Sequence, residues 1–183
     1  MIKDILIYPN PILRQKSKPV EEFDDVLHQL LDDLSETMEH YGGVGLASVQ
    51  IGVPKAAFII NIPVKDENDE DIIKKENLIE VINPQIISQD GEQVFSEGCL
   101  SVPGYTTEIK RAKTIQVKYQ DRYGNHISKK FYGYMAVAWL HECEHLSGRI
   151  FVENLNFTDR KKFEKNWKKK KKKKKNEENK NKI

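Results

Sequence analysis

The chain has 183 residues, enough for one domain with a substantial core, and its two cysteines argue against a disulfide-stabilised scaffold. No apolar run approaches the roughly 20 residues that a membrane-spanning helix needs, so we expect a cytoplasmic protein with no membrane partner. The formal net charge of +2 combines a net −8 in residues 1–160 with a net +10 in residues 161–183. The charge of the whole chain is therefore no indication of a nucleic-acid-binding protein.

The first predicted helix covers residues 24–41. Asp24 or Asp25 is a candidate N-cap, and Gly42 and Gly43 end the pattern. Its apolar side chains recur at helical spacing, as expected for a helix packed on a sheet: Leu27, Leu30, Leu31, Leu34, Met38 and Tyr41.

Short β-rich segments fill the middle of the chain, separated by turn signals such as Asn83-Pro84 and Asp90-Gly91. Strands are expected at residues 56–62, 79–82, 86–88, 93–95, 107–109, 115–119 and 128–131. The charged segment 65–77 is predicted to be a solvated loop. A second helix is expected over residues 134–146, with Gly148 as its C-cap. Strands outnumber helices and do not alternate with them, which favours the α+β class.

The chain ends in a lysine-rich segment. Thr158 and Asp159 are candidate caps for a final helix, on which Phe163 and Trp167 lie four residues apart and pack on the body. The eight consecutive lysines at 168–175 repel one another, and such runs are typical of disordered segments. We therefore predict a domain over residues 1–165 and a disordered tail over residues 166–183.

The second helix contains the sequence His-Glu-Cys-Glu-His at residues 141–145. Two histidines four residues apart project from one face of a helix, which suits two imidazoles that bind one metal ion. A metal ion lowers the pKa of a bound water until the water is a nucleophile near neutral pH. Glu142 is then placed to act as general acid and base, which is the chemistry of amide hydrolysis.

A catalytic centre of this kind needs a third protein ligand. A histidine at the position of Phe151 would complete one extended form of the motif, and that form is excluded. Glu153 or Glu164 would complete a zinc protease, which remains an alternative. Cys143 lies about 200° around the helix from the histidines, so Cys99 is the remaining thiolate candidate.

Three motifs occur in order along the chain: Gly43-Val44-Gly45-Leu46-Ala47-Ser48-Val49-Gln50, Glu97-Gly98-Cys99-Leu100-Ser101 and His141-Glu142-Cys143-Glu144-His145. On these motifs the chain resembles the bacterial-type peptide deformylases over roughly residues 3–165. The resemblance implies short, mostly antiparallel strands around a central helix that carries the histidines. It also implies removal of the N-formyl group from the formyl-methionine of nascent polypeptides, with release of formate.

The resemblance assigns roles to individual residues. The metal ligands are Cys99, His141 and His145, and they hold one Fe(II), which Zn, Ni or Co replaces in purified protein. Gln50 and the backbone N–H of Leu100 stabilise the oxyanion, while Glu97 and Arg111 correspond to an ion pair beside the site. The substrate-binding residues are Val44, Gly45, Phe95, Glu97, Gly98, Tyr134, Val137 and Ala138.

Three residues depart from the family pattern: Val49 replaces a proline, Leu140 a glutamine and Glu144 an aspartate. Residues around metal ligands orient them, so these departures leave open an inactive, ribosome-associated metal-binding homologue. For an enzyme acting on nascent chains, the basic tail predicts non-specific contact with the ribosome surface and its RNA. The sequence carries no signal of oligomeric state.

Overall fold

The structure is a computed structural model that describes residues 1–180 of the chain. It divides into two compact units, Met1–Ile150 and a second unit that begins at Phe151. The predicted domain end at residue 165 was based on composition, not on compactness, and stays a prediction. The two units are described separately below.

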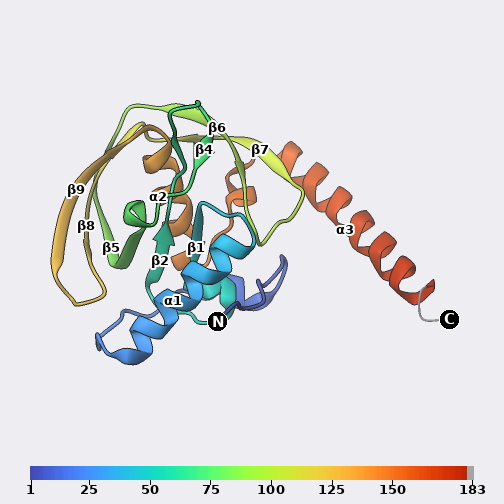
Figure 1. The fold of residues 1–183 in the computed structure, drawn as a ribbon. Coiled ribbons are helices and arrows are strands. Elements are labelled where there is room, and N and C mark those ends of the chain that lie inside the picture. Colours follow the sequence, from blue (N-terminus) through green and yellow to red (C-terminus); the bar gives the residue numbers. More distant parts are fainter. Residues whose placement is uncertain (181–183) are drawn as a thin grey trace. The chain divides into compact units, whose positions relative to one another are not determined.

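The first unit is built on antiparallel sheets (Figure 1). A five-stranded sheet has the order β1-β2-β5-β8-β9, and two hairpins pair β3 with β4 and β6 with β7. The two α-helices of the unit are α1 (Asp25–His40) and α2 (Gly133–Leu146). The strands are β1 (Gly45–Ala47), β2 (Ala57–Ile60), β3 (Val64–Lys65), β4 (Asp71–Ile72), β5 (Ile79–Asp90), β6 (Gln93–Gly98), β7 (Thr106–Arg111), β8 (Thr114–Gln120) and β9 (His126–Tyr132). The α+β class and the central helix that carries the histidines are confirmed.

Helix α1 begins where the sequence placed it. The Asp24 side chain accepts a hydrogen bond from the backbone N–H of Leu27 at 3.0 Å, which confirms Asp24 as the N-cap. The helix ends at His40 with Tyr41 as its C-cap, and Gly42 follows with a φ of +66°, which favours glycine. Its leucines pack with buried residues of β1 and β2 in one core cluster.

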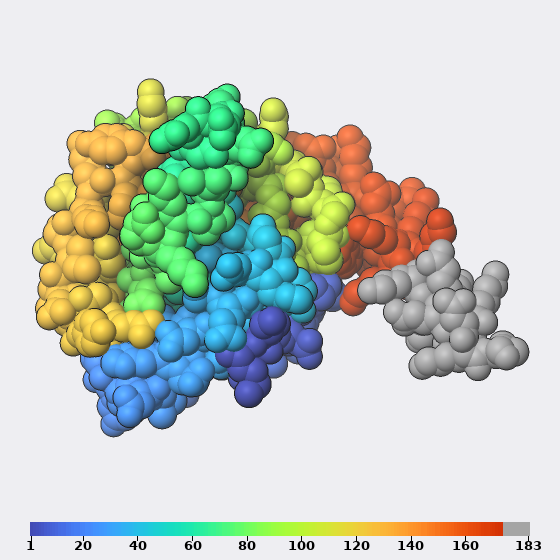
Figure 2. Space-filling model, viewed as in Figure 1, coloured from blue at the N-terminus to red at the C-terminus, as the bar shows by residue number. Residues whose placement is uncertain are grey.

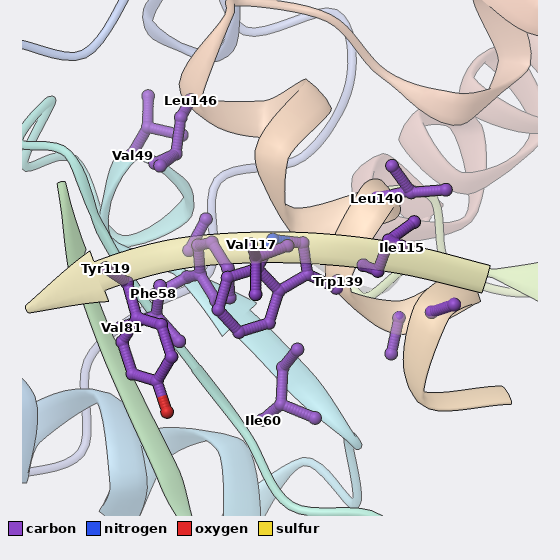
Figure 3. Close-up of a cluster of buried hydrophobic side chains, with 13 residues drawn as sticks. Val49, Phe58, Ile60, Val81, Ile115, Val117, Tyr119, Trp139, Leu140 and Leu146 are labelled. Carbon is purple, nitrogen blue, oxygen red and sulfur yellow. The ribbon is translucent and has the colours of Figure 1, made fainter. Parts of the chain in front are cut away.

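Helix α2 carries the second core cluster (Figure 3). Trp139 is fully buried, and its ring lies 5.2 Å from Phe58, 5.1 Å from Tyr119 and 5.1 Å from Phe131, measured between ring centroids. Leu140 is part of the same cluster. This packing fixes the rotation of α2 about its axis, and therefore fixes where the side chains of its other face point.

Strand β5 is one continuous strand, whereas two separate strands with a turn at Asn83-Pro84 were predicted. Asn83 instead forms a bulge with a φ of +51°, and the register with β8 shifts between Ile82 and Gln85. Its side chain accepts from the N–H of Val20 at 2.8 Å and donates to Gln120 at 2.9 Å. These contacts from distant parts of the chain stabilise a conformation that local sequence reads as a turn.

Short elements lie in two further segments, of which 65–77 was predicted to be a solvated loop. The motif 43–50 contains β1 and a 3-10 helix, η2 (Ser48–Ile51), and the charged segment 65–77 contains β4, part of the β3–β4 hairpin and a 3-10 helix, η3 (Lys75–Asn77). The β3–β4 segment is largely exposed, and it lies on the surface that Figure 2 shows. A further 3-10 helix, η1 (Pro11–Arg14), precedes α1.

The second unit contains a 3-10 helix, η4 (Phe151–Asn154), and the long helix α3 (Phe157–Lys180). Its N-terminal cap is Asn156, which accepts from the N–H of Asp159 at 2.9 Å, and not Thr158 or Asp159 as predicted. Phe163 and Trp167 are buried and their rings stack, with centroids 5.6 Å apart.

Residues 166–180 are helical, whereas disorder was predicted from residue 166. Lysine has a high intrinsic helix propensity, which counts against the charge repulsion on which the prediction rested. Residues 181–183 of the predicted tail lie outside the described residues. Across residues 1–180, no helix combines the length and the apolar character needed to cross a membrane.

Candidate metal centre and active site

Three potential metal ligands converge in the first unit. Cys99 follows β6 directly, and His141 and His145 lie one turn apart on α2. Their ligand atoms all lie within 4.8 Å of one another, and the Sγ of Cys99 is 3.3 Å from the Nε2 of His145. One thiol and two imidazoles form a donor set that fits Zn²⁺ or another transition metal. Among the side chains that the structure describes, this is the one group that meets the geometry of a metal site.

A buried ion pair orients His141. The Nδ1 of His141 lies 2.8 Å from Oε1 of Glu97, and Arg111 donates from its Nη2 to the same carboxylate at 2.9 Å. Although burial raises the pKa of Glu97, the hydrogen bonds from His141 and Arg111 lower it below its usual range. An ionised carboxylate only accepts, so Nδ1 of His141 carries its proton and Nε2 remains for a metal. Both Glu97 and Arg111 are buried, so this is not a solvated surface ion pair.

Glu144 extends this network. Arg111 donates from Nη1 to Oε1 of Glu144 at 3.0 Å and from Nη2 to Oε2 at 3.1 Å. The guanidinium is thus held between two carboxylates, and these ion pairs raise the pKa of Arg111 although its burial lowers it. Glu144, one methylene longer than the family's aspartate, is therefore connected to His141 through Arg111 and Glu97.

The two histidines have different electrostatic environments. Burial, together with the neighbouring His141 and Arg111, lowers the pKa of His145 well below its usual range, so its imidazole is neutral and suited to bind a metal. Burial also disfavours the charged form of His141, but its interactions with Cys99 and Glu97 raise its pKa well above the usual range.

Glu142 lies on the same helix and is buried, with 4% of its surface exposed. Among the described residues its Oε2 has no hydrogen-bond partner. Burial, with a smaller contribution from Glu97, raises the pKa of Glu142 to about 7, against the opposing effects of His141 and Arg111. A buried carboxyl group that titrates near neutrality is suited to accept and return a proton.

Gln50, in η2, is the next polar group beside the metal ligands. Its Oε1 accepts from the N–H of Ala47 at 2.8 Å, which fixes the orientation of the amide. Its Nε2 donates to Ser101 Oγ at 3.0 Å and lies 3.5 Å from the Sγ of Cys99. A preoriented N–H donor therefore lies next to the predicted ligand cysteine.

A pocket of about 920 Å³ opens onto these groups. Gln50, Leu100 and Glu142 line it, as do all but one of the predicted substrate-binding residues, namely Val44, Gly45, Glu97, Gly98, Tyr134, Val137 and Ala138. Phe95 is not part of this lining and packs on Tyr134, with ring centroids 5.5 Å apart. The pocket wall is predominantly apolar, with a few polar groups near the metal ligands, which is typical of small-ligand and peptide-end sites.

Part of the pocket wall was not predicted from the sequence. Ile5 and Ile7 line it. Their segment near the N-terminus forms backbone hydrogen bonds with the motif that contains Gln50 and with the motif that contains Ser101. The N–H of Leu6 donates to the carbonyl of Gln50, and that of Tyr8 to Ser101, both at 2.8 Å. The short apolar run Ile5-Leu6-Ile7 was the available signal, but nothing local indicates that it lies beside the pocket.

Cys143 and Leu140, in and next to the helical motif, pack in the core and not at the metal ligands. Cys143 packs against the core cluster of Trp139, and burial raises its pKa, so its thiol is uncharged and lies outside the ligand group. Leu140 is buried in the same cluster, where an apolar side chain is suited to its surroundings.

The fold and the site together define a metal-dependent hydrolase of the His-Glu-x-x-His class. Residues 2–161 match the family described as polypeptide deformylase. The chain is 49% identical over 168 residues to the peptide deformylase of Nautilia profundicola, covering 92% of this chain and 94% of that protein. It is 48% identical over 170 residues to that of Campylobacter jejuni, covering 92% and 95%.

Solved structures agree with the sequence relatives. The crystal structure of a peptide deformylase from Legionella pneumophila has a TM-score of 0.82 at 37% identity, covering 94% of this chain and 96% of that one. A Met-Ala-Ser-bound peptide deformylase from Acinetobacter baumannii has a TM-score of 0.77 at 28% identity, covering 85% and 99%. The chain belongs to the peptide deformylase family. It removes the N-formyl group from the N-terminal methionine of nascent polypeptides by hydrolysis.

Shortening Glu144 to the family's aspartate will change activity by less than about 10-fold. Glu97 still holds Arg111 in the Glu144→Asp variant, so His141 keeps its hydrogen-bond acceptor. The measurement is kcat/KM for a short formyl-methionyl peptide, with metal content determined in parallel. A much larger gain in activity would show instead that Glu144 impairs the natural chain.

Proposed function

We propose that this chain performs deformylation with one Fe(II) held by Cys99, His141 and His145, with Glu142 as the general acid and base. The observation that carries the proposal is the convergence of three ligand atoms beside a buried carboxyl group, in the wall of an apolar pocket. The donor set alone would equally suit zinc, and the choice of iron rests on the family resemblance.

A divalent metal at this position supplies a Lewis acid that polarises a carbonyl group and yields a nucleophile from water near neutral pH. The protein residues supply the rest. Glu142 accepts a proton from the attacking water and then donates it to the leaving amine. Burial keeps this proton transfer out of bulk water and holds the pKa of Glu142 near 7, where both directions of transfer remain accessible.

Two donors are proposed for the oxyanion that forms during hydrolysis. The side-chain amide of Gln50 is oriented by Ala47 before any substrate arrives, so it needs no rearrangement during the reaction. The second donor is the backbone N–H of Leu100, a residue that directly follows the proposed ligand cysteine and lines the same pocket. Both donors lie beside Cys99, where the formyl carbonyl would be placed.

The substrate end is proposed to enter the pocket with the methionine side chain against Val137, Ala138 and Tyr134, and the peptide backbone beside Val44 and Gly98. The Acinetobacter baumannii relative has been solved with Met-Ala-Ser bound, which supports a peptide that begins with methionine as the kind of ligand this chain takes. An apolar wall of this kind is suited to an unbranched thioether side chain.

The direct test is formate release from formyl-Met-Ala, measured anaerobically with protein loaded with Fe(II) or with Ni(II). Turnover without internal cleavage of casein supports the proposal. Casein cleavage would favour the protease that Glu153 or Glu164 completes, and metal binding without turnover would favour an inactive homologue. Cys99 offers a third potential ligand atom beside the two histidines, which favours the Cys-His-His set over one completed by a glutamate.

We also propose that the protein acts in the cytoplasm, at the ribosome, through its lysine-rich segment. Residues 161–183 carry a net charge of +10, and the lysines 168–173 are exposed on α3. A polyanionic RNA surface attracts such a segment through release of counterions, without recognition of base sequence. The free thiols of Cys99 and Cys143 are consistent with a reducing compartment.

Replacing the lysines at 168–175 by glutamine will weaken co-sedimentation with ribosomes and flatten its salt dependence. Turnover of free formyl-Met-Ala should stay within about 2-fold, because these residues lie outside the unit that holds the site. Glutamine keeps the helix propensity of lysine and removes its charge, and a truncation after Phe163 provides the comparison without most of α3. Sedimentation that is equal for all three proteins at low and high salt would contradict ribosome binding by the tail.

A further inference from the structure

Gly45 lies at the start of β1, directly against Glu142 of α2. A Cβ atom built on Gly45 would overlap Oε1 of Glu142 and would lie 3.0 Å from its Cδ and 3.2 Å from its Cγ. These are the three nearest atoms to that position, and all belong to the proposed general acid and base. The space beside the backbone of Gly45 is therefore the space in which the end of the Glu142 side chain lies.

The backbone itself does not require glycine at this position. Glycines with a left-handed φ occur elsewhere in the described chain, for example Gly42 and Gly52, but Gly45 is not one of them. Gly45 pairs with Ile60 of β2 in a regular antiparallel register, which alanine also adopts. The obstacle to a side chain at Gly45 is thus Glu142 and not backbone strain.

Helix α2 has little freedom to move away from β1. Trp139 anchors one face of the helix in the core, and His141 and His145 must stay close to Cys99 for a metal to bind. The Glu142 side chain is therefore the part that yields, because its carboxyl end rotates more easily than the helix shifts. Such a rotation moves the Glu142 carboxyl group away from its position at the pocket wall.

We propose that Gly45 is a positioning residue: by having no side chain, it leaves the volume that holds the Glu142 carboxyl group at the pocket wall beside the metal ligands. The proposal rests on the proposed role of Glu142 in proton transfer. It gives the second glycine of the Gly-Val-Gly sequence a role in catalysis that is separate from backbone contact with the peptide.

Gly43 provides a comparison on the same segment. A Cβ on Gly43 would lie 2.8 Å from Cδ1 of Leu100, and its next neighbours are 3.4 Å and 3.5 Å away. The end of a leucine side chain can turn aside without moving an acid or base. We therefore expect Gly43→Ala to reduce kcat by much less than Gly45→Ala does.

The activity test is a double-mutant cycle. Gly45→Ala should lower kcat for formyl-Met-Ala by about 100-fold, as for a misplaced catalytic group, with a much smaller change in KM and no loss of bound metal. In a Glu142→Asp background the carboxyl group is drawn back by one methylene, so Gly45→Ala should cost less than about 10-fold. An equal loss of kcat in both backgrounds, or a loss confined to KM, would overturn the proposal.

A stability cycle tests the contact without any turnover. Gly45→Ala should lower the midpoint of thermal unfolding in the otherwise natural chain, and should not lower it when Glu142 is already alanine. A drop of equal size in both backgrounds would show that the added methyl meets something other than Glu142. If natural protein failed to release formate while this cycle behaved as expected, the proposed function would fail and the contact would stand.

Discussion

Replacing Glu142 by alanine will lower kcat for formyl-Met-Ala by about 10² to 10⁴-fold while the protein keeps its metal. The carboxyl group lies next to the ligands in sequence but is not among the atoms that converge on the metal position. Its burial, its unpaired Oε2 and a pKa near 7 all suit proton transfer. The measurement combines formate release with metal content of the same preparation.

Glu142→Gln is the matched control, because it keeps the volume of the side chain and removes the group that titrates. Both variants should lose turnover, whereas alanine alone also leaves a cavity beside Gly45. A parallel fall of metal content and turnover in Glu142→Gln would show that the carboxylate is a ligand, and the role in proton transfer would be wrong.

The metal site was largely predictable because its geometry is local. Two histidines four residues apart face the same way on any α-helix, and a residue between them, such as Cys143, faces elsewhere. Cys99 lies far away in the sequence; it became the thiolate candidate because Cys143 faces away from the histidines, and the order of the three motifs then supported it. The structure brings its sulfur to 3.3 Å from His145.

The surroundings of the site depend on tertiary contacts, which sequence does not reveal locally. Nothing in the sequence shows that Glu144 binds Arg111, or that Arg111 in turn holds the acceptor of His141. Leu140, a departure that raised the alternative of an inactive homologue, has an ordinary explanation in the core cluster. The roles of Glu144 and Leu140 on α2 depend on contacts with β6, β7 and the core, which lie far from α2 in sequence.

The fold shows the same division between local and distant causes. The amphipathic α1 and its Asp24 cap follow from spacing and capping rules, and both were predicted. The bulge at Asn83 was missed because its stabilising partners, Val20 and Gln120, lie 63 and 37 residues away. Ile5 and Ile7 line the pocket for a similar reason, since Gln50 and Ser101 hold their segment in place.

Cys99→Ser will weaken metal binding by more than about 100-fold, whereas Cys143→Ser will leave it nearly unchanged. A serine hydroxyl is a much poorer ligand than a thiolate for zinc or iron, and Cys99 alone of the two cysteines lies with the histidines. The measurement is metal content after dialysis against a chelator, together with the thermal unfolding midpoint, which should rise with added metal in the natural chain and in Cys143→Ser only.

The pair of variants also separates loss of a ligand from loss of packing. Cys143 packs against the core cluster, so its replacement by serine places a hydroxyl in an apolar environment and should lower stability without touching the ligand set. Cys99→Ser should show the opposite pattern, with little change in unfolding when a chelator has removed the metal. Equal metal loss in both variants would refute Cys99 as the third ligand. It would mean that the sulfur of Cys143, on the opposite face of α2, matters to the metal as much as the sulfur of Cys99, which lies 3.3 Å from His145.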